Sequence, residues 1–180
     1  MKANPFITNS PALKSQILRS LQRLPPLTGS PIRLSRAAGL HDRHGDSHGV
    51  TFLRERRILF DCIRAEFPRI FVHEVFHFVW LRAGNATRNS FEKILAAEIA
   101  NGARGELGWS AEWRKLELTT ADRRGRTRRW REYCCESFCD TAAWIYSGFE
   151  RHDEFTLAKN CRKLRRQWFA DTLSVSQIPI

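Results

Sequence analysis

The strongest constraint on the fold is an apolar stretch that carries three polar residues. The run Ile70–Leu81 is rich in Phe, Val and Trp, yet it contains His73, Glu74 and His77. It is shorter than the ~20 apolar residues that a membrane-spanning helix needs. Pro68 suits the first position of a helix, where its missing N–H is not required. The sequence therefore predicts a buried helix from Pro68 to about Arg82, whose polar side chains need partners inside the protein.

The three polar residues form the pattern H-E-x-x-H, from His73 to His77. On a helix, residues four apart lie on the same face, so two imidazoles in this pattern can bind one Zn²⁺. The glutamate beside the first histidine can then take a proton from the water at that metal. The alternative is a pair of core histidines that hydrogen-bond within the protein. The cost of burying unpaired polar groups in so apolar a helix favours the metal site.

A catalytic zinc needs a third protein ligand and one position left for water. Some zinc peptidases place a third histidine six residues after the motif, but Ala83 occupies that position. Two later glutamates are candidates. Glu98 lies on the apolar side of a predicted helix that ends near Asn101, and Glu136 lies on a predicted helix over residues 129–147. Asp140 follows Glu136 by one helical turn, so both carboxylates lie on one helical face.

The H-E-x-x-H motif together with Glu136-x-x-x-Asp140 resembles the gluzincin branch of the zincin metallopeptidases. The resemblance spans residues 50–147 and implies that Glu136 binds the zinc and that Asp140 hydrogen-bonds a ligand histidine. Glu98 remains the alternative ligand, although Gly102 stands where the aspartate would be. The implied fold is α+β: a small zincin-like domain with a short mixed β-sheet, an active-site helix and a glutamate-bearing helix. The implied function is a zinc-dependent metallopeptidase with Glu74 as general base.

The residues before the motif helix predict strands. Residues 50–53 and 57–63 carry β-branched and aromatic residues around a charged centre, which predicts a hairpin or two short strands. The resemblance implies an edge strand that binds an extended substrate by strand addition, and residues 57–63 are our candidate for it. The family's transition-state donor, a tyrosine or histidine, has no motif match, but Tyr133, Tyr146 and His152 are nearby in the sequence.

The net charge of +11 is concentrated in two places. Residues 1–41 hold six basic residues and no acid, and residues 114–131 hold eight basic residues against two acids. The segment Arg123–Arg131 combines six arginines with Trp130, as phosphate contacts and base stacking require. The SprT-like peptidases, which also carry H-E-x-x-H and act on proteins attached to DNA, are similar in this basic character. The alternative function is therefore a basic nucleic-acid-binding module with a structural or vestigial zinc site; a solvated loop would explain the segment equally well.

The length of 180 residues suits one compact domain with an appendage. Five of the seven prolines fall in the first 31 residues. We therefore expect a weakly structured basic N-terminal segment over residues 1–45, with one short helix, and a zincin-like metallopeptidase domain over residues 46–180. An organelle transit peptide has a composition similar to that of the N-terminal segment.

Cysteine and histidine supply two weaker signals. The five cysteines are odd in number and three of them, Cys134, Cys135 and Cys139, are crowded together, which favours reduced thiols and a cytoplasmic location. We expect buried hydrophobic residues here, with thiolate ligands of a structural zinc as the alternative; a thiol near the metal could also make the site sensitive to oxidation. The histidine-rich segment 41–48 predicts a polar loop, or otherwise a second metal ligand set.

Overall fold

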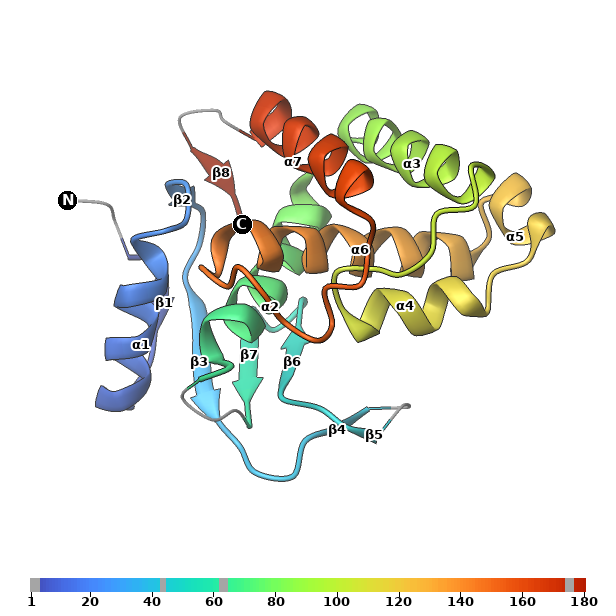
Figure 1. Cartoon of the computed structure of the whole chain (residues 1–180). Helices are drawn as coiled ribbons and strands as arrows, with labels where there is room; N and C mark the ends of the chain where they lie inside the picture. Colours follow the sequence, from blue (N-terminus) through green and yellow to red (C-terminus); the bar gives the residue numbers. More distant parts are fainter. Residues whose placement is uncertain (1–3, 43–44, 62–64, 174–176) are drawn as a thin grey trace.

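The computed structural model describes residues 4–42, 45–61, 65–173 and 177–180, and it shows a mixed α+β fold (Figure 1). The described strands are β1 (Phe6–Ile7), β2 (Leu27–Thr28), β3 (Ile32–Arg36), β4 (His41–Asp42), β5 (Gly45–Asp46), β6 (Gly49–Phe52), β7 (Arg57–Phe60) and β8 (Ile178–Pro179). The described helices are α1 (Pro11–Leu21), α2 (Phe67–Arg82), α3 (Asn85–Ala100), α4 (Trp109–Leu116), α5 (Thr120–Gly125), α6 (Arg128–Tyr146) and α7 (Lys159–Leu173). The expected fold class, α+β with a short mixed sheet, is confirmed.

The main sheet has four strands in the order β1-β3-β7-β6. Strands β1, β3 and β7 run parallel, whereas β6 and β7 form an antiparallel hairpin in which Gly49 faces Phe60. Two further pairs, β2 with β8 and β4 with β5, complete the described strands. The hairpin agrees with the prediction, but β7 is an inner strand and β6 lies at the edge. The assignment of the edge strand to residues 57–63 is therefore wrong for 57–60, and residues 62–63 fall outside the described residues.

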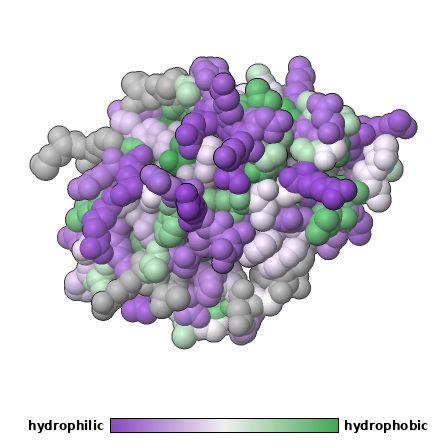
Figure 2. All heavy atoms as spheres, in the orientation of Figure 1, coloured by the Kyte–Doolittle hydropathy of each residue, from purple (hydrophilic) through white to green (hydrophobic). Residues whose placement is uncertain are grey.

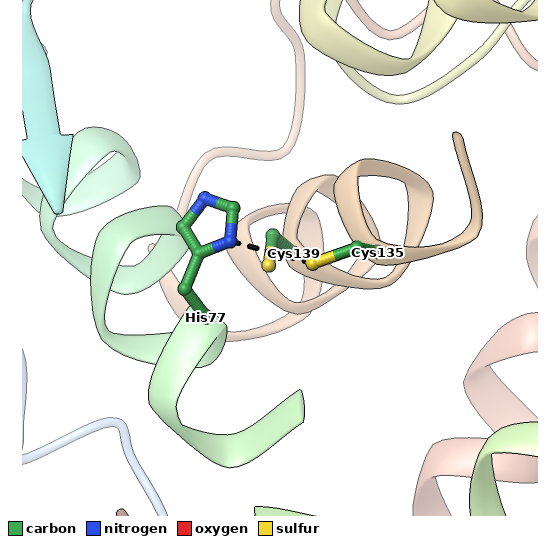
Figure 3. A group of neighbouring side chains, drawn as sticks. All are labelled: His77, Cys135 and Cys139. Atoms are coloured by element: carbon green, nitrogen blue, oxygen red, sulfur yellow. Dashed lines mark hydrogen bonds between the residues drawn. The ribbon is translucent and has the colours of Figure 1, made fainter. Parts of the chain in front are cut away.

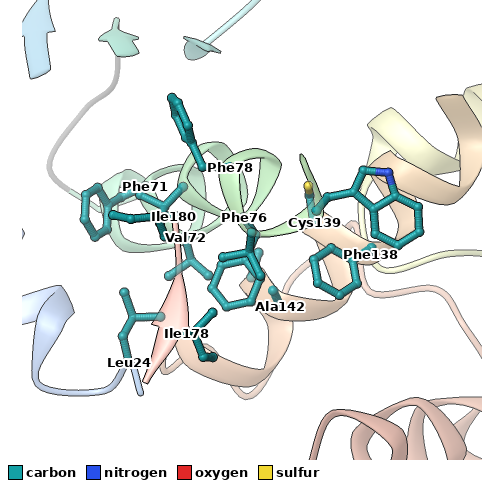
Figure 4. Packing of buried hydrophobic residues seen from close by; sticks show 14 of the residues in the cluster. Leu24, Phe71, Val72, Phe76, Phe78, Phe138, Cys139, Ala142, Ile178 and Ile180 are labelled. Atoms are coloured by element: carbon teal, nitrogen blue, oxygen red, sulfur yellow. The ribbon is translucent and has the colours of Figure 1, made fainter. Parts of the chain in front are cut away.

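Helix α2 is the centre of the molecule. It is apolar on nearly every side, as a helix surrounded by other elements must be, and Phe71, Val75 and Phe76 are fully buried. The sheet and α1 lie on one side of α2, and α6 packs along another (Figure 1). Close packing between α2 and α6 is visible around Phe76 and Phe138 (Figure 4), whose ring centroids are 5.8 Å apart. The core therefore fixes the two helices that bear the motif residues relative to each other.

The N-terminal segment differs from the prediction. Strand β3 lies inside the main sheet, and Ile17, Ile32 and Leu34 are buried in the same core as α2. The proline-rich stretch at 24–31 includes β2, which pairs with β8. The expected short helix is present as α1, but the expectation of a weakly structured segment over 1–45 is wrong for residues 6–36, because α1 and β3 bury apolar side chains in the core.

The helix boundaries also show local differences. α2 begins at Phe67, one residue before the predicted Pro68, and α6 spans Arg128–Tyr146 rather than residues 129–147. Helices α4 and α5 are not among the predicted helices. α5 is capped by Thr119, whose side chain accepts a hydrogen bond from the Asp122 N–H.

The surface seen in Figure 2 is mostly hydrophilic, with small scattered hydrophobic areas. Within the described part of the chain, every helix is too short or too polar to cross a lipid bilayer.

Candidate metal centre

Helices α2 and α6 bring three potential metal ligands together. His73 and His77 lie one turn apart on α2, with ring centroids 5.0 Å apart, and Glu136 faces them from α6. One ligand atom from each of the three lies within 4.8 Å of the others. We call these residues the triad. They are the residues that the sequence analysis selects as zinc ligands.

Asp140 holds the first histidine in a defined orientation. The Nδ1–H of His73 donates to Asp140 Oδ1 at 2.7 Å, and the opposite ring nitrogen, Nε2, faces Glu136 Oε2 at 3.3 Å. Metal-binding histidines commonly donate their other ring N–H to a carboxylate in this way. Asp140 also accepts the backbone N–H of Ala111 at the start of α4. Gly108 allows this approach, because a Cβ there would lie 2.2 Å from the carboxylate carbon.

The spacing within the triad fits a metal ion. Zinc bonds of about 2.0–2.2 Å to nitrogen and oxygen, at a tetrahedral angle, place the two ligand atoms about 3.4 Å apart. The observed separation of His73 Nε2 and Glu136 Oε2 is 3.3 Å. The donor types of the triad and this one separation are therefore compatible with zinc.

Arg114 is a residue at this site that the sequence analysis misses. It extends from α4, and its Nη2 lies 3.5 Å from Glu136 Oε1, the carboxylate oxygen turned away from His73. Its Nε is buried without a hydrogen-bond partner among the described residues. The sequence offers no signal for this contact, since α4 itself is not predicted.

The electrostatics of the triad favour positive charge on the imidazoles. Burial alone would lower the pKa of His77, but the facing Cys135 and Glu136 outweigh it and raise this pKa from 6.5 to about 9. The pKa of His73 also rises well above 6.5, since Asp140 and Glu136 outweigh its burial. Burial would raise the pKa of Glu136, but the two histidines and Arg114 lower it to about 2. The cluster thus attracts cations, either protons or a metal.

Glu74 is positioned by the edge strand. Thr51 of β6 donates from its hydroxyl to Glu74 Oε2 at 2.6 Å. β6 runs close to α2 here, and a Cβ at Gly49 would lie 2.9 Å from Glu74 Oε1 and 2.7 Å from the side chain of Ile70. The glycine therefore permits the close approach of the edge strand to the motif helix.

A cavity of about 380 Å³ opens beside the motif. His73, Glu74 and Asp140 line it, together with His48 and His152. His152 is the candidate donor that reaches this cavity, and its Nε2–H faces Glu66 Oε2 at 3.2 Å.

The two tyrosine candidates lie elsewhere. Tyr133 is fully buried and donates to Glu106 at 2.6 Å, and Tyr146 packs against Phe76 and Phe169. His152 therefore remains the one of the three in a position to contact a ligand in the cavity.

Glu98, the alternative third ligand, belongs to a different cluster. Its carboxylate accepts the Nε–H and Nη2–H groups of Arg165 at 3.1 and 2.6 Å. Arg165 is completely buried and also donates to Glu106 at 2.7 Å. Glu106 in turn lies 3.1 Å from Lys115 Nζ. We call Arg165, Glu98, Glu106 and Lys115 the Arg165 cluster, and it accounts for Glu98 without any metal.

The basic segment Arg123–Arg131 does not present an aromatic platform. Trp130 is buried, and its indole N–H donates to Glu92 Oε2 at 3.1 Å. Arg126 binds the same carboxylate at 2.6 Å. The expected use of Trp130 for base stacking is therefore wrong, because the indole forms part of the core beneath the segment.

Some of the remaining histidines and cysteines lie near the triad, and others do not. His41 lies in β4 and His48 lines the cavity, while His44 is outside the described residues. Cys135 and Cys139 form, with His77, a second group of potential metal ligands (Figure 3). Hydrogen bonding from Cys139 and the facing His77 lower the pKa of the Cys135 thiol to about 6, despite its burial.

Comparisons with protein-family models, with curated proteins and with solved structures found no match to this chain.

Proposed function

We propose that the protein is a zinc-dependent metallopeptidase in which His73, His77 and Glu136 hold the metal and Glu74 is the general base. The observation that carries the proposal is the arrangement of these side chains. One ligand atom from each of His73, His77 and Glu136 lies within 4.8 Å of the others. Asp140 accepts from His73 Nδ1 at 2.7 Å, as carboxylates commonly do beside metal-binding histidines. Glu74 lines the cavity next to them.

The mechanism follows from the positions of the side chains. When bound, zinc would act as a Lewis acid that polarises the scissile carbonyl and lowers the pKa of a water molecule. Glu74, held by Thr51, takes the proton of the attacking water and passes it to the leaving amine. Asp140 keeps the His73 ring in the tautomer that has a free Nε2.

Substrate binding is supported by the edge of the sheet. β6 is paired with β7 on one side, and it lies next to the cavity through Gly49. An extended peptide added to its other edge would pass the motif helix in the manner of strand addition. His152 lines the same cavity and is our candidate for the group that stabilises the developing negative charge.

The test combines metal content with hydrolysis. Chelator-washed protein is expected to take up one zinc per chain and to cleave peptides in a mixed peptide library. Glu74→Gln should keep the zinc and lose about 10²–10⁴-fold in rate, the usual contribution of a general base. Glu136→Gln should lower zinc affinity, whereas Glu98→Gln should leave zinc affinity unchanged. Wild-type rates in Glu74→Gln, or no zinc uptake by the wild type, would contradict the proposal.

A further inference from the structure

Helix α6 presents two thiols to His77 as well as the triad carboxylate. Cys135 and Cys139 are four residues apart and therefore lie on one face of the helix. The Cys135 sulfur lies 3.4 Å from His77 Nδ1, and one ligand atom from each of the three residues lies within 4.8 Å of the others. Figure 3 shows one ring nitrogen of His77 directed at the two sulfurs and the other on the far side of the ring.

We propose that His77, Cys135 and Cys139, which we call the sulfur set, bind a soft metal ion such as Cd²⁺ or Cu⁺ and compete with the triad for His77. Bonds of the lengths that zinc makes, about 2.3 Å to sulfur and 2.0–2.1 Å to nitrogen, place the two atoms about 3.5 Å apart at a tetrahedral angle, and a larger ion such as Cd²⁺ needs slightly more. The observed distance between Cys135 Sγ and His77 Nδ1 is 3.4 Å. Two thiolates and one imidazole are ligands that select soft cations over the harder ones favoured by carboxylates.

Two of the three residues are in contact with solvent. Cys139 is fully buried, whereas Cys135 and His77 are partly exposed. The other described cysteines are placed differently. Cys134, the residue before Cys135 on α6, is buried in the main core, and Cys161 packs in a separate hydrophobic cluster. The geometry thus singles out two of the four described thiols.

The competition follows from the chemistry of the ring. A neutral imidazole has one N–H and one lone pair, so it can bind a metal through one nitrogen. Since Nδ1 faces the sulfurs, His77 has only Nε2 left for the triad. Binding at the sulfur set takes up the Nδ1 lone pair, so any proton on Nδ1 or on the two thiols leaves to solvent. The ring then keeps its proton on Nε2, which cannot ligate. Metal binding by the sulfur set is independent of the proposed peptidase activity, whereas the competition rests on it.

Cadmium is the probe, because thiolate ligation gives a sulfur-to-cadmium charge-transfer absorption. Every protein in the series carries Cys62→Ser, since Cys62 lies outside the described residues. We expect one cadmium per chain with this absorption, retained in His73→Ala and in Cys134→Ala. Cys135→Ser and Cys139→Ser should each lose at least half of the absorption. Equal absorption in the Cys135→Ser/Cys139→Ser double variant would overturn the sulfur set; circular dichroism confirms that each variant is folded.

The competition has its own readout. Cadmium added to zinc-loaded protein should release one zinc per cadmium bound, measured by elemental mass spectrometry, and should abolish hydrolysis. The Cys135→Ser variant should keep its zinc under the same conditions. One zinc and one cadmium on the same chain would overturn the competition. Failure of the peptidase proposal is distinguishable, because zinc-loaded protein would then be inactive before any cadmium is added while the cadmium absorption remains.

Discussion

Two buried polar clusters lie against neighbouring faces of α6, and they differ in how their charge is balanced. Arg165 donates to Ser137 and to Glu106, so the Arg165 cluster contacts one face of α6 and pairs two carboxylates with two cations. The candidate metal centre uses Glu136 and Asp140 on the adjacent face, where both carboxylates face the imidazole of His73, at 3.3 and 2.7 Å.

The two clusters differ in the chemistry of the groups that face the carboxylates. Buried ions that are fully paired stabilise a fold only modestly but are costly to break. Arginine and lysine keep their charge, whereas an imidazole nitrogen can bind either a proton or a metal ion. The four predictions below test this distinction, beginning with the largest expected effect.

Removing the central cation should break the Arg165 cluster. Arg165→Met leaves two buried carboxylates without their main partner, which we expect to lower the free energy of unfolding by about 3–5 kcal/mol. Denaturant titration measures this loss. The exposed Lys163 on the same helix is the control, and Lys163→Met should change stability by less than about 0.5 kcal/mol. An equal effect of the two substitutions would show that the cluster does not stabilise the fold.

The Arg165 cluster should also determine the response to acid. Burial would raise the pKa of Glu106, but Arg165 and Lys115 lower it from 4.5 to about 2. Because this pKa is depressed in the folded protein, ionised Glu106 makes its full contribution to the free energy of unfolding above pH 4.5. That contribution is lost as the pH falls toward about 2. The expected loss is about 3 kcal/mol. The free energy of unfolding, measured across this pH range, should depend less steeply on pH in Glu106→Gln than in the wild type. An unchanged slope would contradict the assignment.

The candidate metal centre should instead lose stability as the pH rises. In metal-free protein the pKa of His77 is raised from 6.5 to about 9. Because this pKa is raised in the folded protein, protonated His77 makes its full contribution to the free energy of unfolding below pH 6.5. That contribution, at most about 3 kcal/mol, is lost as the pH rises through about 9. Zinc should abolish this loss, because it replaces the protons. Thermal unfolding of metal-free and zinc-loaded protein between these pH values makes the comparison; parallel curves would rule out zinc at His77.

The smallest effect concerns the orientation of one ring. Asp140→Asn should weaken zinc binding by about 10–100-fold, the usual cost of losing a carboxylate that holds a ligand histidine. Competition with a chromogenic chelator measures the affinity. Asp171, an exposed residue on α7, provides a control in Asp171→Asn. Should both variants bind zinc as wild type does, Asp140 would only cap α4 through Ala111.

The candidate site was more predictable from the sequence than the fold around it. The spacing in H-E-x-x-H and in Glu136-x-x-x-Asp140 depends only on helical periodicity, so the side chains that meet could be chosen in advance. The partners Arg114 and Thr51 could not, because they come from elements that are remote in sequence. The role of Glu98 was likewise ambiguous until Arg165 was seen beside it.

The sequence by itself determined the helices α2 and α6, the β6–β7 hairpin and the residues that each presents on one face. These features depend on local periodicity and on the residues that begin and end each element. Only the tertiary structure decided that β3 enters the sheet, that β6 is the edge strand and that Trp130 is buried. Pairing and burial depend on contacts between segments far apart in the chain, and such contacts leave no periodic signal in either segment.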